Sequence, residues 1–160
     1  MGVSVYEQQP ASQAPSATSE TVILCNWTQP FPAAAGIGGG RQITGMLCIA
    51  NSAAAVVTST IKCRGVPYAV TASSGAGSSN VPPAIGNTAA VTNYTQIGGS
   101  AQLFSVPASA TIEQPFGFYD NSVEGYAFYV ITLTAGTSSD LTVNDGYLLA
   151  LLVEPYGSDV

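Results

Sequence analysis

The stretch FYDNSVEGYAFYVITL, residues 118–133, gathers five aromatic residues in a chain that has few aromatics and very few charges. If GYAFYVITL (125–133) is a β-strand, alternate side chains point to opposite faces of its sheet. One face then carries Tyr126, Phe128, Val130 and Thr132, and the other carries Ala127, Tyr129, Ile131 and Leu133. Both faces are apolar, whereas a strand of an antiparallel sandwich ordinarily has one polar face.

The segment YLLALLVE (147–154) has the same property, because Tyr147, Leu149, Leu151 and Val153 alternate with Leu148, Ala150 and Leu152. Two explanations fit a strand with two apolar faces. Copies of the protein cover the outer surface of the sheet around a symmetry axis, or a long loop of the same chain lies over it. We favour the subunit interface, because the low charge of the chain points the same way. The predicted interface residues are Tyr126, Phe128, Tyr129, Leu149 and Leu151.

The rest of the chain also consists of short apolar runs separated by Gly, Pro, Ser and Asn. The predicted strands are 21–27, 43–50, 54–63, 66–72, 90–97, 101–107, 111–120, 125–135, 141–143 and 147–154. This spacing predicts an all-β fold, an antiparallel β-sandwich or jelly roll. Residues 51–53 read as the loop of a hairpin between 43–50 and 54–63, and Asn144–Asp145–Gly146 as a tight turn.

Residues 1–20, MGVSVYEQQPASQAPSATSE, are rich in Gln, Pro, Ser and Ala and show no amphipathic period. Such a segment becomes ordered only when something ties it down. We predict an extended N-terminal arm over 1–20, followed by a single domain over 21–160. The arm either reaches a neighbouring subunit or folds back on its own domain.

Charged residues make up only 8% of the chain, against roughly 25% in an ordinary globular protein. The net charge is −6 and the basic residues are Arg41, Lys62 and Arg64, which argues against nucleic acid binding. MGVSVYEQQP lacks the features of a secretion signal, and no apolar run approaches the length of a membrane span. We expect a protein made in the cytosol, with no membrane or nucleic acid partner.

The chain has no histidine, which removes the commonest general base and metal ligand. Its three cysteines, Cys25, Cys48 and Cys63, lack metal-site spacing and are expected to be buried thiols, with one internal disulfide as the alternative. A carboxylate pair for hydrolysis would have to come from Glu113, Asp120 and Glu124, a weak basis for an enzyme. Trp27 and Tyr94 are possible sugar platforms, but both lie in strand-like runs and are expected in the core. We predict no catalytic residue, cofactor or metal.

The segment PFGFYDNSVEGYAFYVITLTAGTSSDLTVNDGYLLALLVE (115–154) resembles the late strands of bacteriophage structural jelly rolls of the TNF-like or C1q-like type. The strand ITGMLCIA (43–50) and the later step Lys62–Cys63–Arg64–Gly65 are similar to the early half of those modules, so that the resemblance covers about 40–154. Such modules include capsid cement (decoration) proteins and tail-fibre tips, and they commonly form trimers. The resemblance carries no catalytic residues.

The resemblance implies a virion structural protein, a capsid cement protein that binds the outside of the major capsid lattice as a homotrimer. It is expected on the virion surface after synthesis in the host cytoplasm. Val3, Val5 and Tyr6 of the arm are the residues expected to contact the major capsid protein. The alternatives are a tail-fibre or receptor-binding tip domain and a minor jelly-roll capsid subunit.

Overall fold

The computed structural model describes residues 3–8, 12–25, 40–66, 83–88, 91, 94–122, 126, 128–136 and 140–153. Within them the chain forms eight strands and no α-helix. The strands are β1 (Val3–Gln8), β2 (Thr21–Cys25), β3 (Gly40–Asn51), β4 (Val57–Val66), β5 (Thr95–Val106), β6 (Thr111–Asp120), β7 (Phe128–Thr134) and β8 (Leu141–Val153). The described residues include no helix with the length and hydropathy needed to cross a bilayer.

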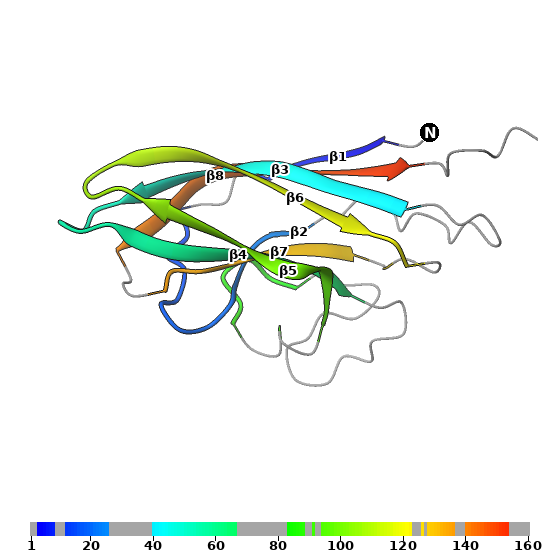
Figure 1. Cartoon of the computed structure of the whole chain (residues 1–160), viewed down its shortest axis with the longest axis horizontal. Helices are drawn as coiled ribbons and strands as arrows, with labels where there is room; N and C mark the ends of the chain where they lie inside the picture. Colours follow the sequence, from blue (N-terminus) through cyan, green and yellow to red (C-terminus); the bar gives the residue numbers. More distant parts are fainter. Residues whose placement is uncertain are drawn as a thin grey trace, which may run out of the picture.

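The strands form two antiparallel four-stranded sheets that pack face to face (Figure 1). Sheet A has the order β1-β8-β3-β6, and sheet B has the order β2-β7-β4-β5. The pairs β1 with β8, β2 with β7, β3 with β6 and β4 with β5 are nested, as in one long hairpin that is rolled up on itself. The predicted antiparallel β-sandwich is confirmed.

The main core lies between the sheets and follows strand alternation. Sheet A contributes Ile43, Leu47, Phe116, Phe118 and Leu148, and sheet B contributes Ile61, Phe104, Tyr129, Ile131 and Leu133. Each β7 residue in this set alternates with one that faces the other way, as the sequence predicted. Burial of these side chains, at about 25 cal/mol per Å² of apolar surface, is the main stabilising contribution.

The predicted hairpin between 43–50 and 54–63 is wrong, because β3 lies in sheet A and β4 in sheet B. The side chain of Asn51 explains how the chain changes sheets here. Its amide group donates to the carbonyls of Ala55, Val106 and Pro107, at 2.9, 3.1 and 3.0 Å. Its carbonyl oxygen accepts a hydrogen bond from the backbone N–H of Ala53. These bonds attach the connection between β3 and β4 to the end of β5. The sequence around Asn51 does not predict this contact.

The predicted tight turn at Asn144–Gly146 is also wrong, because β8 runs through it without a break. Cys48 pairs with Asp145 and Ile49 with Val143, so Asn144 is the extra residue of a β-bulge. A Cβ atom on Gly146 would lie 2.7 Å from Leu47 Cδ2. The glycine therefore permits close strand packing rather than a reversal of the chain.

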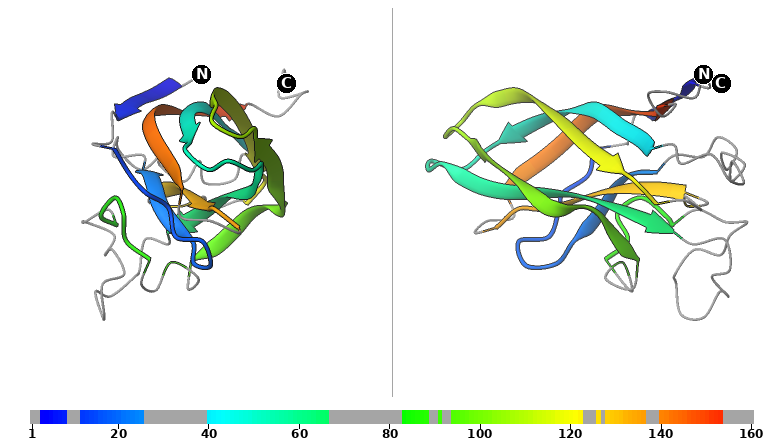
Figure 2. Two further views of the ribbon diagram at one scale, coloured as in Figure 1. Left: turned by 90° about the vertical axis from the view of Figure 1, so that its left-hand side faces the viewer. Right: turned by 45° about the vertical axis from the view of Figure 1, so that its right-hand side comes forward.

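The segment predicted as an arm is part of the sandwich in a single chain. Residues 3–8 form the edge strand β1, and Gln13 continues along the same edge of β8 through two backbone hydrogen bonds to Val143. Residues 12–20 then run down one side of the sandwich from sheet A to β2 in sheet B (Figure 2). In the single chain, residues 3–8 and 12–20 therefore fold back on their own domain, which is one of the two alternatives for the arm.

Glu20, at the end of this segment, is held on the outer face of sheet B. Its carboxylate accepts hydrogen bonds from Lys62 Nζ at 2.7 Å, from Arg64 Nε at 2.5 Å and from Thr132 Oγ1 at 3.2 Å. Burial alone would raise the pKa of Glu20, but the hydrogen bonds and charges of Arg64 and Lys62 outweigh it and lower the pKa to about 2. The ion cluster therefore fastens residues 12–20 to β4 and β7.

The pKa of Glu20 predicts an acid-sensitive contribution to stability. A carboxylate whose folded pKa lies below its unfolded value, 4.5, stabilises the fold above that value and loses the effect as the pH falls from about 4.5 to about 2. Because solvent partly screens this surface ion cluster, the contribution at neutral pH is about 1–2 kcal/mol. We expect Glu20→Gln to lower the free energy of unfolding at pH 7 by about 1–2 kcal/mol and to flatten its pH dependence in that window.

Urea denaturation between pH 2 and 7 measures this effect. Glu113→Gln is the matched control, because Glu113 is an exposed carboxylate on β6. An acid-dependent loss of stability that is the same in Glu20→Gln as in the wild type would contradict the assignment.

Candidate functional site

The outer faces of the two sheets differ in how the chain covers them. On sheet B, a second apolar cluster of Val22, Cys25, Val66, Phe128 and Val130 is covered by Val91 and Tyr94, with Ile85 packed against it. Backbone hydrogen bonds from Val22 to Asn87 and from Gly86 to Val22 tie the covering segment to β2. The second apolar face of β7 is therefore buried by the chain itself. Of the two explanations for a strand with two apolar faces, cover by a segment of the same chain applies to β7.

Sheet A carries a different outer surface, which we call the sheet A face. It is formed by the outward side chains of β3, β6 and β8, and the described residues place no segment over it. Its apolar members are Met46, Pro115, Tyr119, Tyr147 and Leu149. Tyr119 is 51% exposed and Tyr147 39% exposed, which is unusual for aromatic residues in a chain with so few of them.

Strand register brings these side chains together. Met46 lies opposite Pro115 on one side and opposite Tyr147 on the other, so that the three form one row across the sheet. The next row joins Gly117, Thr44 and Leu149. A third row places Cys48 between Glu113 and Asp145, and a shallow depression of about 140 Å³ lies between this row and Met46 and Tyr147. An apolar centre with a polar border is the usual anatomy of a protein–protein interface.

The structure separates four of the five predicted interface residues, and the side chain of the fifth, Leu151, lies outside the described part of the chain. Tyr129 is 2% exposed in the main core, and Phe128 lies in the covered cluster on sheet B. Tyr126 precedes β7 and packs against the main core, with its ring 6.0 Å from that of Tyr129 in an edge-to-face contact. Leu149 is half-buried on the sheet A face. Leu149 and Tyr126 are therefore the described members of the set that keep exposed surface.

The predicted arm residues meet the predicted interface strand. In the pairing of β1 with β8, Val3 lies opposite Leu151, Val5 opposite Leu149 and Tyr6 opposite Leu148. β1 thereby extends sheet A on its β8 side, next to the sheet A face. Sequence reasoning treated the arm and the strand at 147–154 as separate elements, and only the strand register shows that they are neighbours.

Sequence reasoning missed Met46, Pro115 and Tyr119. The alternation in ITGMLCIA contains part of the signal, since Thr44, Met46 and Cys48 fall on the face opposite to Leu47 and Ile49. What the sequence does not contain is the position of β3 between β6 and β8, which brings side chains from three distant segments into one row.

The charged residues inside the sandwich serve its structure. Arg41 and Asp120 are cross-strand neighbours on β3 and β6, both nearly fully buried, with Arg41 Nη1 3.9 Å from Asp120 Oδ2. The Tyr129 hydroxyl donates to the same oxygen at 2.6 Å, and the Ser122 N–H donates to Asp120 Oδ1 at 2.9 Å. Burial and the hydrogen bond to Asp120 raise the pKa of the Tyr129 phenol. This phenol stays protonated and acts as a fixed donor.

The cysteines are not joined by a disulfide, and Cys25 and Cys63 are buried as predicted while Cys48 is half-buried. Burial raises the pKa of the Cys25 thiol to about 12, and burial together with the charge of Asp120 raises that of Cys63. Thiols of this kind are poor nucleophiles.

Among the described residues, no three His, Cys, Asp or Glu side chains lie together in a way that could hold a metal ion. Glu113 and Asp120 are described and Glu124 is not; Tyr94 is buried as expected, and Trp27 lies outside the described residues.

The hydrogen bonds around Asp120 predict that loss of the Tyr129 hydroxyl group lowers the stability of the fold. Tyr129→Phe removes a donor from a buried carboxylate, and we expect the free energy of unfolding to fall by about 2 kcal/mol. Tyr126→Phe is the matched control, because the contacts of Tyr126 with the core and with the Tyr129 ring do not use its hydroxyl; its effect should stay within about 0.5 kcal/mol. Equal effects of the two substitutions in urea denaturation would refute the role of the hydrogen bond.

No protein-family model matches this chain, and no curated protein matches its sequence. Three features of the chain itself therefore bear on its function. These are the uncovered sheet A face, the edge strand β1 beside it, and a set of charges that are engaged within the sandwich.

Proposed function

We propose that this chain is a virion structural protein, a cement protein that binds the outside of a major capsid lattice as a homotrimer. The nested strand order supports the jelly-roll part of the proposal, because an eight-stranded double-sheet jelly roll is built from nested antiparallel pairs. The protein acts through buried surface and not through chemistry. It is made in the host cytoplasm and ends on the capsid surface.

The observation that carries the proposal is the contrast between the two outer faces. Ile85, Val91 and Tyr94 cover the outer apolar cluster of sheet B, whereas no described segment covers the two tyrosines, the methionine and the leucine on sheet A. A soluble monomer gains nothing from such an exposed patch, whereas an assembly buries it.

The distribution of charge supports the same proposal. All three basic side chains form ion pairs inside the chain, Lys62 and Arg64 with Glu20 and Arg41 with Asp120. No basic side chain is left to serve a phosphate or an acidic substrate. A surface of small neutral residues repels neighbours weakly and suits a protein that is packed against others.

The edge strand β1 suits the contact with the capsid. An edge strand presents unpaired backbone groups on its outer side, and these can pair with another chain. Val3, Val5 and Tyr6 lie on this strand, so the proposal keeps them as the residues that contact the major capsid protein.

Labelling of intact particles tests the location. Antibody or gold label against this chain should decorate the head. Label confined to the tail would replace the cement proposal with its alternative, a receptor-binding tip domain.

The sheet A face is tested by one substitution with a matched control. Leu149→Asp places a charge in the apolar centre of the face and should convert the trimer into a folded monomer in native mass spectrometry. Leu103→Asp changes a leucine that is 71% exposed on β5, away from the sheet A face, and should leave the trimer intact. A wild-type protein that is monomeric at micromolar concentration, or a Leu149→Asp trimer as stable as the wild type, would sink the assignment of this face.

Two N-terminal deletions test the proposed capsid contact, and the position of Glu20 is the reason why their effects should differ. Removal of residues 1–20 deletes the ion cluster with Arg64 and is expected to destabilise the fold. Removal of residues 1–8 deletes only β1, so we expect a folded protein that no longer binds capsids. Unchanged capsid binding of this shorter deletion in co-sedimentation would refute the role of β1.

A further inference from the structure

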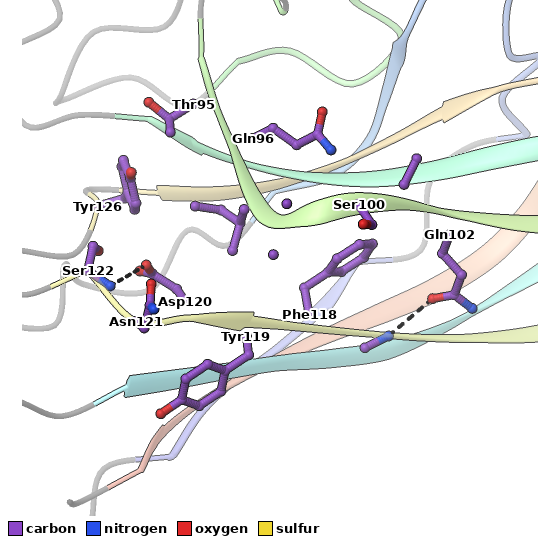
Figure 3. A pocket seen from close by; sticks show the side chains of 15 residues that line it. Thr95, Gln96, Ser100, Gln102, Phe118, Tyr119, Asp120, Asn121, Ser122 and Tyr126 are labelled. Atoms are coloured by element: carbon purple, nitrogen blue, oxygen red, sulfur yellow. Dashed lines mark hydrogen bonds between the residues drawn. The ribbon is translucent and has the colours of Figure 1, made fainter.

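A groove lies between β5 and β6, the edge strands of the two sheets (Figure 3). It has a volume of about 830 Å³ and lies on the side of the sandwich opposite to residues 12–20. Ligand sites in proteins commonly have volumes of about 300–1,000 Å³. The groove shares Gly117 and Tyr119 with the border of the sheet A face, but its lining does not include the central row of Pro115, Met46 and Tyr147.

Two glycines explain why the groove exists. Gly98 and Gly99 have φ angles of +76° and +69°, in the left-handed region that side chains disfavour. They interrupt the pairing of β5 with β4, where Ile61 pairs with Gln102 and Cys63 with Ile97. A Cβ atom on Gly99 would meet nothing within 4 Å, so this residue borders open space.

The walls of the groove are fixed before any ligand arrives. The Gln102 side chain bridges the two strands, because its amide donates to the Pro115 carbonyl at 2.8 Å and accepts from the Gly117 N–H at 3.4 Å. At the other end, Asp120 is held by Tyr129 and by the Ser122 backbone. Fixed walls reduce the entropy that binding must overcome.

The lining has the chemistry of a neutral, hydroxyl-rich ligand. Side chains with amide or hydroxyl groups, Gln96, Ser100 and Asn121, lie along the same groove as the aromatic rings of Phe118 and Tyr126. The lining includes no basic residue, and its one carboxylate, Asp120, is engaged within the wall. Amides and hydroxyls pair with sugar hydroxyls, and aromatic rings pack against the apolar faces of sugar rings.

An extended peptide suits the groove less well. A peptide would have to add to the edge of β6, but Gln102 already occupies the hydrogen-bonding groups of Pro115 and Gly117. Further along, β5 lies against that edge, since a Cβ atom on Gly98 would be 3.4 Å from Phe118 Cδ1 and 3.8 Å from the Tyr119 backbone nitrogen. No free length of strand edge remains for β-addition.

From this geometry we propose that the groove between β5 and β6 binds a short neutral oligosaccharide. Gln96, Ser100 and Asn121 hydrogen-bond its hydroxyls, and the partly exposed ring of Tyr126 contacts a ring face. The site goes beyond the proposed cement function and does not depend on it, because it lies within one chain and needs no capsid.

A printed array of neutral, sialylated and sulfated oligosaccharides tests the proposal on the full chain. We expect binding to neutral glycans, with amide shifts at Gly98, Gly99 and Gly117 when the strongest of them is titrated in NMR. Ser100→Trp fills the groove and should weaken binding by about tenfold or more. Ser105→Trp is the matched control on the same strand, exposed and outside the groove, and should bind as the wild type does.

Absence of any neutral-glycan signal would overturn the proposal. It would also be overturned by a preference for the sulfated glycans, or by binding that Ser100→Trp and Ser105→Trp affect equally. Folding of both variants is checked by the NMR spectrum. Because the array contains no capsid component, its result is independent of the labelling and trimer experiments.

Discussion

The carboxylate of Glu20 is the contact on which the arrangement of this chain depends. It brings together Lys62 and Arg64, two of the three basic residues in the sequence, and holds them 2.7 and 2.5 Å away on the outer face of sheet B. Such a group would be costly to bury alone, but it has at least three donors. The cluster fixes the path of residues 12–20, and this path places β1 at the edge of sheet A and β2 at the edge of sheet B. A single ion cluster thus anchors the segment 12–20 that connects the two sheets.

The two sheets then differ for a physical reason. Ile85, Val91 and Tyr94 lie over the outer face of sheet B, so Phe128 of β7 is covered by the chain itself. Sheet A receives an extra edge strand but no covering segment among the described residues. The apolar row of Pro115, Met46 and Tyr147 is left exposed as a result. The interface proposed on sheet A rests on which segments the described chain places over each sheet, and not on a special sequence motif.

Alternation in the sequence predicted the sandwich and the division of β7 into two faces, because the period of two follows from backbone geometry alone. It did not predict which apolar face would be covered, since that depends on segments far away in the sequence. Local turn signals failed for related reasons. Asn51 looked like a hairpin loop, but its amide group binds the end of β5, and Gly146 looked like a turn residue, but it makes room for Leu47. In both cases a long-range contact decided the role of a residue that is common in turns.

The two sides of the sandwich, one at the edge strands β1 and β2 and the other at the edge strands β5 and β6, are closed in different ways. This difference bears on function. On the side of β1 and β2, residues 12–20 seal the sandwich with the Glu20 cluster. On the side of β5 and β6 no such segment lies among the described residues, and the Gln102 side chain bridges the strands while Gly98 and Gly99 turn β5 away from its partner. A sandwich needs neither glycine for its core, because Ile97 and Phe104 on either side already supply the apolar contacts of β5. The two glycines are better explained by the groove that they create, since glycine is the residue that adopts this left-handed turn without steric cost.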